Sequence, residues 1–296
     1  MERVVSTVLS APAIWRSDKT VSVTGHTRHR HSPSPISAGF KPPNAGMTLI
    51  FGPSALAASI ARTATLRDAP PEMLASWGNR ALTEVEWLVD DGTTFALSQH
   101  VHSLADAERT SFAGHIGAGV ADLLMNALGY TWRDNASCLS RSLAPHADFI
   151  YADGAVSGHG VALTEAHGSF AANVTSAGTS RRAKDKYLRQ VKPYLAVVFP
   201  HGTVIHGYSI AFASRPGSAG AFLHVAETQI SKPRGKRRPP AQMDPVPGSA
   251  EATPTSLALS AHRSNFSLMN APSVVQWIDW IRNEGESGGF CEVARL

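Results

Sequence analysis

Two acidic residues and one histidine lie where they could bind a metal ion and activate a water molecule. Asp148 stands at the start of one apolar run, and Glu165 and His167 lie two residues apart on a second run beyond a glycine-rich turn. Side chains alternate faces along a strand, so Glu165 and His167 should share a face, and Asp148 joins them if the runs pair as a hairpin. Paired carboxylates suit Mg²⁺ or Mn²⁺. A hairpin with two solvated acids is the alternative.

The basic segment 181–194, which follows the hairpin, is predicted to be a helix. Residues four apart stack on one helix face, which would bring Lys186, Gln190 and Tyr194 together. Pro193 is expected to end the helix just before Tyr194. An ordinary amphipathic helix would show the same spacing.

The surrounding elements predict a mixed α/β layer, with a central sheet flanked by helices. Apolar spacing indicates helices over 54–66, 72–88 and 105–130, and strands over 93–97, 203–213 and 221–229, the last two as an antiparallel pair. Three glycines in the third helix, Gly114, Gly117 and Gly119, are expected to let a strand pack closely on it.

Composition changes along the chain divide it into four parts. Residues 1–46 are rich in Ser, Thr, His and Arg and are expected to be a disordered or weakly ordered extension; a nucleic-acid-binding arm and a transit peptide are alternatives. Residues 47–230 form the α/β domain, with its core at 105–230. Residues 231–255 are a basic, proline-rich linker. Residues 256–296 are expected to be helical, with an apolar stripe that includes Trp277 and Ile281 and docks on the domain, a protein partner or a second copy.

Overall composition is that of a mildly basic globular protein. The 296 residues include 27 Lys and Arg against 23 Asp and Glu, which permits an acidic partner such as DNA. Cys138 and Cys291 fit neither a zinc pattern nor a disulfide framework, so a cytoplasmic location is expected. No run is apolar for long enough to span a membrane, and no secretory signal is recognised. No Gly-X-Ser-X-Gly, phosphate-binding glycine loop or His-Glu-X-X-His motif is present, which disfavours the corresponding hydrolases and zinc enzymes.

The arrangement Asp148 … Glu165-Ala-His167 resembles the PD-(D/E)XK nuclease superfamily. The pattern of that family is an aspartate at the start of one strand and an acid-X-Lys triplet on the next, within a core of helix, mixed sheet and second helix. The segment from Gln190 to Tyr194 resembles the Gln-X-X-X-Tyr motif of its RecB-type branch. The chain departs from the pattern at His167, where the family has lysine, and the preceding proline, Pro145, is displaced from its usual place.

This resemblance implies a restriction-endonuclease-like fold and metal-assisted cleavage of phosphodiester bonds. Asp148, Glu165 and the main-chain carbonyl of Ala166 would hold Mg²⁺ or Mn²⁺. The role of the missing lysine would pass to His167, as a neutral acceptor or a protonated donor, or to Lys186; otherwise the site is inactive.

The expected function is therefore that of a metal-dependent deoxyribonuclease, in bacterial defence, repair or a mobile element. A catalytically inactive nuclease fold that binds nucleic acid or protein is the alternative. The basic helix and linker would contact phosphates through Arg181, Arg182, Lys184, Lys192, Lys236, Arg237 and Arg238.

Overall fold

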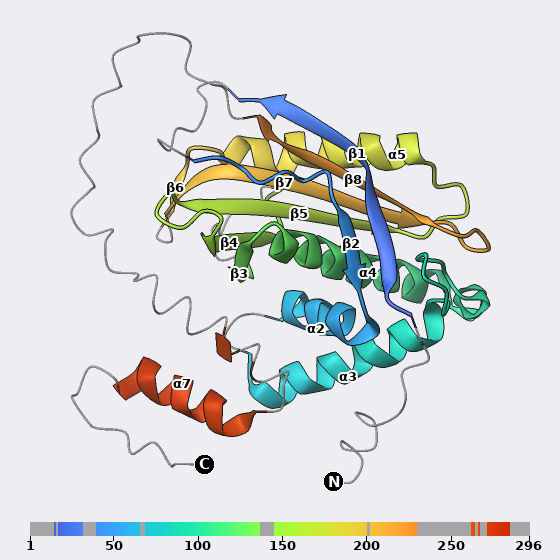
Figure 1. The fold of residues 1–296 in the computed structure, drawn as a ribbon, viewed down its shortest axis with the longest axis horizontal. Coiled ribbons are helices and arrows are strands. Elements are labelled where there is room, and N and C mark those ends of the chain that lie inside the picture. The colour runs from blue at the N-terminus through green and yellow to red at the C-terminus, as the bar shows by residue number, and fades with distance from the viewer. Residues whose placement is uncertain are drawn as a thin grey trace.

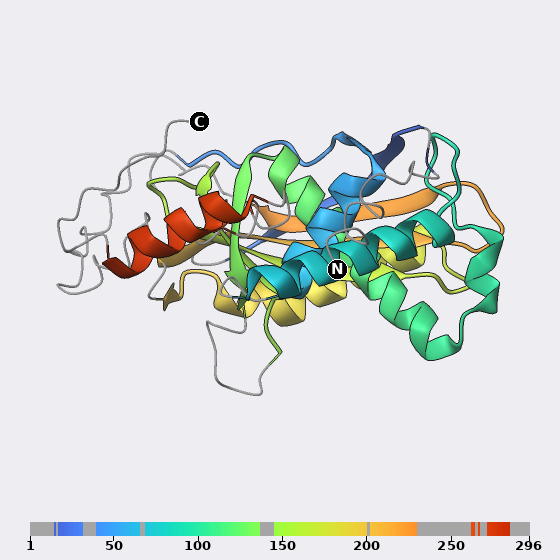
Figure 2. The same ribbon diagram turned by 90° about the horizontal axis from the view of Figure 1, so that it is seen from below.

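A curved mixed sheet lies between helical layers in the computed structural model of the protein (Figure 1, Figure 2). The structure describes residues 15, 17–31, 40–65, 69–136, 145–199, 202–229, 262, 263, 266 and 271–284. The expected α/β class with a mixed central sheet flanked by helices is confirmed.

The sheet has the strand order β2-β1-β8-β7-β5-β4-β3, and β6 pairs with β7 beside this path. The pairs β5–β7 and β1–β8 are parallel, and the other pairs are antiparallel. The strands are β1 Lys19–Arg30, β2 Thr48–Phe51, β3 Tyr130–Asn135, β4 Phe149–Gly154, β5 Val161–Ser169, β6 Val198–Phe199, β7 Gly202–Ser214 and β8 Ala221–Gln229. The predicted β7–β8 antiparallel pair and the β4–β5 hairpin are therefore present.

Helices cover both faces of the sheet, with α5 on one face and α4 on the other (Figure 1). Helices α2 and α3 pack beyond α4, so that the described chain has several layers. The helices are α2 Pro53–Ala64, α3 Pro71–Leu88, α4 Asp106–Ala127, α5 Ser176–Lys186 and α7 Pro272–Glu284, with short helical turns at η1 Gln99–Ser103, η3 Tyr187–Val191 and η4 Lys192–Tyr194.

Helix α4 approaches strand β5 unusually closely because both carry glycine at the contact. A Cβ atom added at Gly117 would lie 2.4 Å from the main-chain nitrogen of Gly168, and one added at Gly168 would lie 1.6 Å from the carbonyl oxygen of Ala113. No side chain fits such a gap. The expectation of close strand packing is confirmed for Gly117, whereas Gly114 faces open space and Gly119 packs on α2.

A buried charged group joins the helical layers to the sheet. Asp122 of α4 is fully buried, pairs with Arg62 of α2, and accepts a hydrogen bond of 2.9 Å from the Tyr151 hydroxyl. These contacts compensate the cost of removing a carboxylate from water. They tie α2 and β4 to α4, which also covers β5.

The sequence-based expectation for the N-terminal part is wrong over Lys19–Arg30. These residues form β1, which pairs with β2 and runs parallel to β8. The strand was hidden by its polar composition, because much of it lies at the outer part of the sheet, where polar side chains are tolerated. Residues 1–14 lie outside the described part.

Two other element predictions need correction. Residues 93–97 form isolated bridges rather than a strand. The predicted helix 181–194 begins earlier, at Ser176, and its last turns are the π-helical η3 and the 3-10 turn η4. Thr175 caps its N-terminus by accepting a hydrogen bond from the main-chain N–H of Gly178.

The C-terminal helix α7 confirms part of the predicted apolar stripe. Val275 and Ile278 are buried, whereas Trp277 remains 46% exposed. Arg263 pairs with Asp279 of this helix and donates a hydrogen bond of 2.8 Å to the carbonyl oxygen of Ala69. Among the described helices, none has the length and apolar character needed to cross a membrane.

Candidate active site

The candidate site lies where strands β4 and β5 separate. Strand β4 pairs only with residues 161–164 of β5, so residues 165–169 have no partner on that side among the described strands. Asp148 immediately precedes β4, and its Oδ2 accepts a hydrogen bond of 2.9 Å from the main-chain N–H of Ala166. The N–H and C=O groups of one strand residue face the same neighbour. The Ala166 carbonyl therefore points to the same edge as Asp148.

Glu165 is the centre of the polar contacts at this edge. Its side chain is only 1% exposed. Lys186, at the end of α5, places its ammonium nitrogen 2.7 Å from Glu165 Oε1, and the Gln190 amide nitrogen lies 3.1 Å from Oε2. The predicted helix face therefore meets the predicted strand acid.

Gln190 and Tyr194 also hold the segment that carries Asp148. The Gln190 amide donates to the carbonyl oxygen of His146 at 2.8 Å, and the Tyr194 hydroxyl donates to that of Pro145 at 3.1 Å. These bonds fix the main chain two and three residues before Asp148. Gln190 and Tyr194 are therefore positioning residues for the acid pair, a more specific role than their spacing predicted.

The ionised forms of both acids are disfavoured, chiefly by burial. Burial, reinforced by the nearby charge of Asp148, raises the pKa of Glu165 to about 8, although Lys186 acts in the opposite direction. Burial also raises the pKa of Asp148, although the hydrogen bond from Ala166 and the charge of Lys186 act to lower it. A cation next to both carboxylates would favour their ionised forms.

His167 is neutral near pH 7. Burial lowers its pKa to about 4, and the positive charges of Arg182 and Lys186 act in the same direction. Of the two roles considered for this residue, the protonated donor is therefore disfavoured and the neutral acceptor fits. The ammonium at the site comes from Lys186 on the helix.

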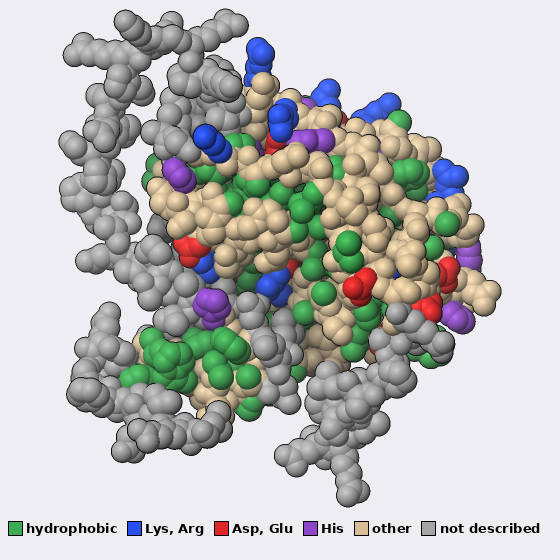
Figure 3. Space-filling view, viewed as in Figure 1, with side chains coloured by type: hydrophobic (Ala, Val, Ile, Leu, Met, Phe, Trp, Pro, Cys, Tyr) green, Lys and Arg blue, Asp and Glu red, His purple; other side chains and the backbone are tan. Residues whose placement is uncertain are grey.

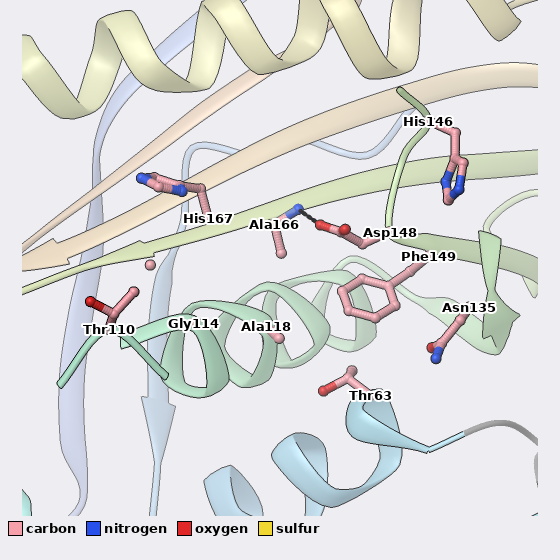
Figure 4. A pocket seen from close by; sticks show the side chains of 11 residues that line it. Thr63, Thr110, Gly114, Ala118, Asn135, His146, Asp148, Phe149, Ala166 and His167 are labelled. Atoms are coloured by element: carbon pink, nitrogen blue, oxygen red, sulfur yellow. Dashed lines mark hydrogen bonds between the residues drawn. The ribbon is translucent and has the colours of Figure 1, made fainter. Parts of the chain in front are cut away.

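A cavity of about 550 Å³ opens beside Asp148, between β5 and α4 (Figure 4). Asp148, Ala166 and His167 form one wall, and residues of four other elements or segments complete it. The residues that sequence reasoning missed are Thr63, Thr110, Gly114, Ala118, Asn135, His146, Phe149 and Gly168. They are scattered along the chain and share no motif, so only the folded arrangement identifies them.

The outer surface of α5 is strongly basic. Arg181, Arg182 and Lys184 are exposed on this helix and Lys192 follows it, and none of the four forms an ion pair with a residue in the described ranges. Lys and Arg side chains gather along the rim where β1 and α5 lie (Figure 3). The other predicted phosphate-binding residues, Lys236, Arg237 and Arg238, lie outside the described part, as do Cys138 and Cys291.

Within the described ranges, no three His, Cys, Asp or Glu side chains come together as a metal site. The candidate donors at the edge of β5 are instead two carboxylates, of Asp148 and Glu165, and one main-chain carbonyl, of Ala166. Comparison of the chain with family models, with curated proteins and with solved structures finds no match.

Proposed function

We propose that this protein is a metal-dependent nuclease that hydrolyses DNA phosphodiester bonds at the open edge of β5. The observation that carries the proposal is the contact of 2.7 Å between the Lys186 ammonium and Glu165, whose charge interacts with that of Asp148. Two acids that can hold a metal ion and one amine that can stabilise negative charge are suited to phosphodiester hydrolysis, and they lie next to a cavity and a basic helix.

The order of elements supports a restriction-endonuclease-like core. Helix α4 is followed by β3, β4 and β5, then by α5 and the parallel strand β7. This is the order of helix, mixed sheet and second helix that the resemblance implies. Asp148 directly precedes the second strand of this unit and Glu165 lies on the third, close to the PD-(D/E)XK pattern, and the lysine comes from the second helix.

The donor set fits a hard divalent cation. The carboxylates of Asp148 and Glu165 and the carbonyl of Ala166 would hold Mg²⁺ or Mn²⁺, with water and phosphate oxygens as further ligands. Burial, and then the charge of Asp148, raise the pKa of Glu165, and a bound cation would favour its ionised form. When bound, the ion would polarise the phosphate and lower the pKa of a water molecule.

The residues around the acids would handle charge and protons. Lys186 would stabilise the negative charge that develops on the phosphate. His167, neutral at pH 7, lines the cavity and can accept a proton from the attacking water. Gln190 and Tyr194 would keep Asp148 in place, and the basic residues of α5 would hold the phosphates that flank the cut.

A nuclease assay with linear, circular and single-stranded DNA, in Mg²⁺, Mn²⁺ or EDTA, tests the proposal. We expect metal-dependent cleavage by wild type that is lost in Glu165→Ala and retained in Asp185→Ala, which removes an exposed acid from α5. Cleavage that survives Glu165→Ala would contradict the assigned site.

The alternative of an inactive, DNA-binding nuclease fold rests on one observation. Both carboxylate oxygens of Glu165 already have partners in Lys186 and Gln190. If wild type binds DNA without cutting it and His167→Lys cuts, the protein is a nuclease fold that has lost activity. If no version binds or cuts DNA, both functions are refuted.

A further inference from the structure

The two sides of the open edge of β5 differ in charge. On the α5 side, Lys186 contacts Glu165, and the charge of Arg182 reaches His167. On the α4 side, the cavity has no Lys or Arg in its lining, and Asp148 is its one acid. A DNA strand that crosses this edge would meet Lys and Arg side chains on one side and a cavity without them on the other, with β5 between α5 and α4 (Figure 4).

Several side-chain oxygens on the α4 side can accept hydrogen bonds from a base. The Thr63 and Thr110 hydroxyls each donate at 2.8 Å to a main-chain carbonyl of their own helix, at Ser59 and Asp106, which leaves only acceptor capacity. The side-chain oxygen of Asn135 is buried without a hydrogen-bond partner. Nucleobases carry N–H groups from which these oxygens can accept hydrogen bonds, and the Asn135 amide N–H₂ can donate to a base oxygen or ring nitrogen.

The size and shape of the cavity also suit a base. About 550 Å³ lies within the range of roughly 300–1,000 Å³ that is typical of small-molecule sites. The small residues Gly114 and Ala118 leave space on the α4 side of the cavity, and the Phe149 ring offers an apolar surface next to Asp148. A paired base is stacked inside the duplex and cannot enter a side cavity unless it is extruded, whereas a base of a single strand can.

We propose that this cavity seats an unpaired base of the strand being cut, so that single-stranded DNA, including an overhanging or frayed end, is the preferred substrate class. This inference rests on the proposed nuclease function. The phosphate backbone would lie along the α5 side, with Lys186 at the cut, and the base next to it would enter between β5 and α4.

Gly114→Leu is the sharpest probe because it fills the cavity without disturbing the core. Gly114 is exposed, and a Cβ atom added there meets nothing within 4 Å. Leucine also favours the helix relative to glycine by about 1 kcal/mol. Ala107→Leu, at an exposed position of the same helix outside the cavity, is the matched control.

Binding is measured by fluorescence anisotropy in EDTA, with a labelled DNA strand alone and paired with its complement, and cleavage of both is measured in Mg²⁺ or Mn²⁺. We expect tighter binding and faster cleavage of the single strand. Gly114→Leu should weaken single-strand binding by about tenfold, as expected for loss of one seated base, and Ala107→Leu should not.

The other outcomes refute either the base-binding role of the cavity or the nuclease function itself. If duplex and single strand are bound and cut equally, or if Gly114→Leu behaves as wild type, the base-binding role of the cavity is refuted and the nuclease function stands. If wild type cuts neither DNA with either metal, the proposed nuclease function itself is refuted, and this inference with it.

Discussion

Glu165 should destabilise the folded protein near neutral pH when no metal is bound. Its folded-state pKa is raised from 4.5 to about 8, chiefly by burial and then by the charge of Asp148. A raised folded-state pKa means that the native state binds this proton more tightly than the unfolded state does. The associated stability is fully present below about pH 4.5 and is lost as pH rises to about 8.

The size of the effect follows from the same two values. Each tenfold change in proton affinity corresponds to about 1.4 kcal/mol, so full ionisation above pH 8 would lower the free energy of unfolding by up to about 5 kcal/mol, and by about 3 kcal/mol at pH 7. These are upper limits because the repulsion is shared with Asp148. Glu165→Gln removes the charge and keeps an oxygen to accept from Lys186. We expect this change to raise the free energy of unfolding by about 1–3 kcal/mol at pH 8 and by little at pH 4.5.

Urea unfolding in EDTA at several pH values measures this difference, and Glu108→Gln, at an exposed position of α4, is the control. Adding Mg²⁺ or Mn²⁺ at pH 8 should stabilise wild type by mass action and leave Glu165→Gln unchanged. If Glu165→Gln is less stable than wild type at pH 8, the ion pair with Lys186 outweighs burial and repulsion, and the reasoning is refuted.

Three further changes test separate parts of the structure. Lys186→Met should lower the cleavage rate by roughly 10²–10³-fold in a single-turnover assay, as for loss of one charge-stabilising group. Lys184→Met, at an exposed position of the same helix, should change the rate by less than about threefold. Equal losses in the two variants would contradict the role assigned to Lys186. Gly168→Ala should lower the free energy of unfolding by about 1–3 kcal/mol or more, because the added methyl meets a carbonyl of α4; Gly114→Ala should raise it by up to about 1 kcal/mol. Asp122→Ala should cost about 3–5 kcal/mol in urea unfolding, because it removes the carboxylate that pairs with the largely buried guanidinium of Arg62. A cost under about 1 kcal/mol would show that the guanidinium reaches water.

Most of the secondary structure around the site could be predicted because its periodicity is strong. The observed bounds of β8, Ala221–Gln229, are the predicted ones, and α4 differs from the predicted 105–130 by a few residues. Strand β1 was missed because its partner β8 lies some 200 residues away and its apolar alternation is limited to Val21 and Val23, the rest of the strand being polar.

The residues of the site also differ in how far they could be predicted from sequence. Glu165, Lys186 and Gln190 could be brought together from sequence because strand alternation and helical spacing each restrict where a side chain points. The backbone contacts of Gln190 and Tyr194 with residues 145 and 146 depend on how α5 crosses the sheet, which no local pattern gives. The cavity depends on the packing of α2 and α4 as well, so its lining could not be listed in advance.

Because the ammonium group at the site comes from Lys186 of α5, a histidine at position 167 is compatible with an active site. Arg182 and Lys186 already place two positive charges close to His167, and these charges lower its pKa in addition to the larger effect of burial. A lysine at 167 would add a third cation to this side of β5, beside two acids that would also bind a metal ion. A neutral imidazole avoids that repulsion and retains a nitrogen that can accept a proton. Lys186 and His167 are therefore best understood together: the helix supplies the charge, and the strand supplies an uncharged acceptor at the edge of the cavity.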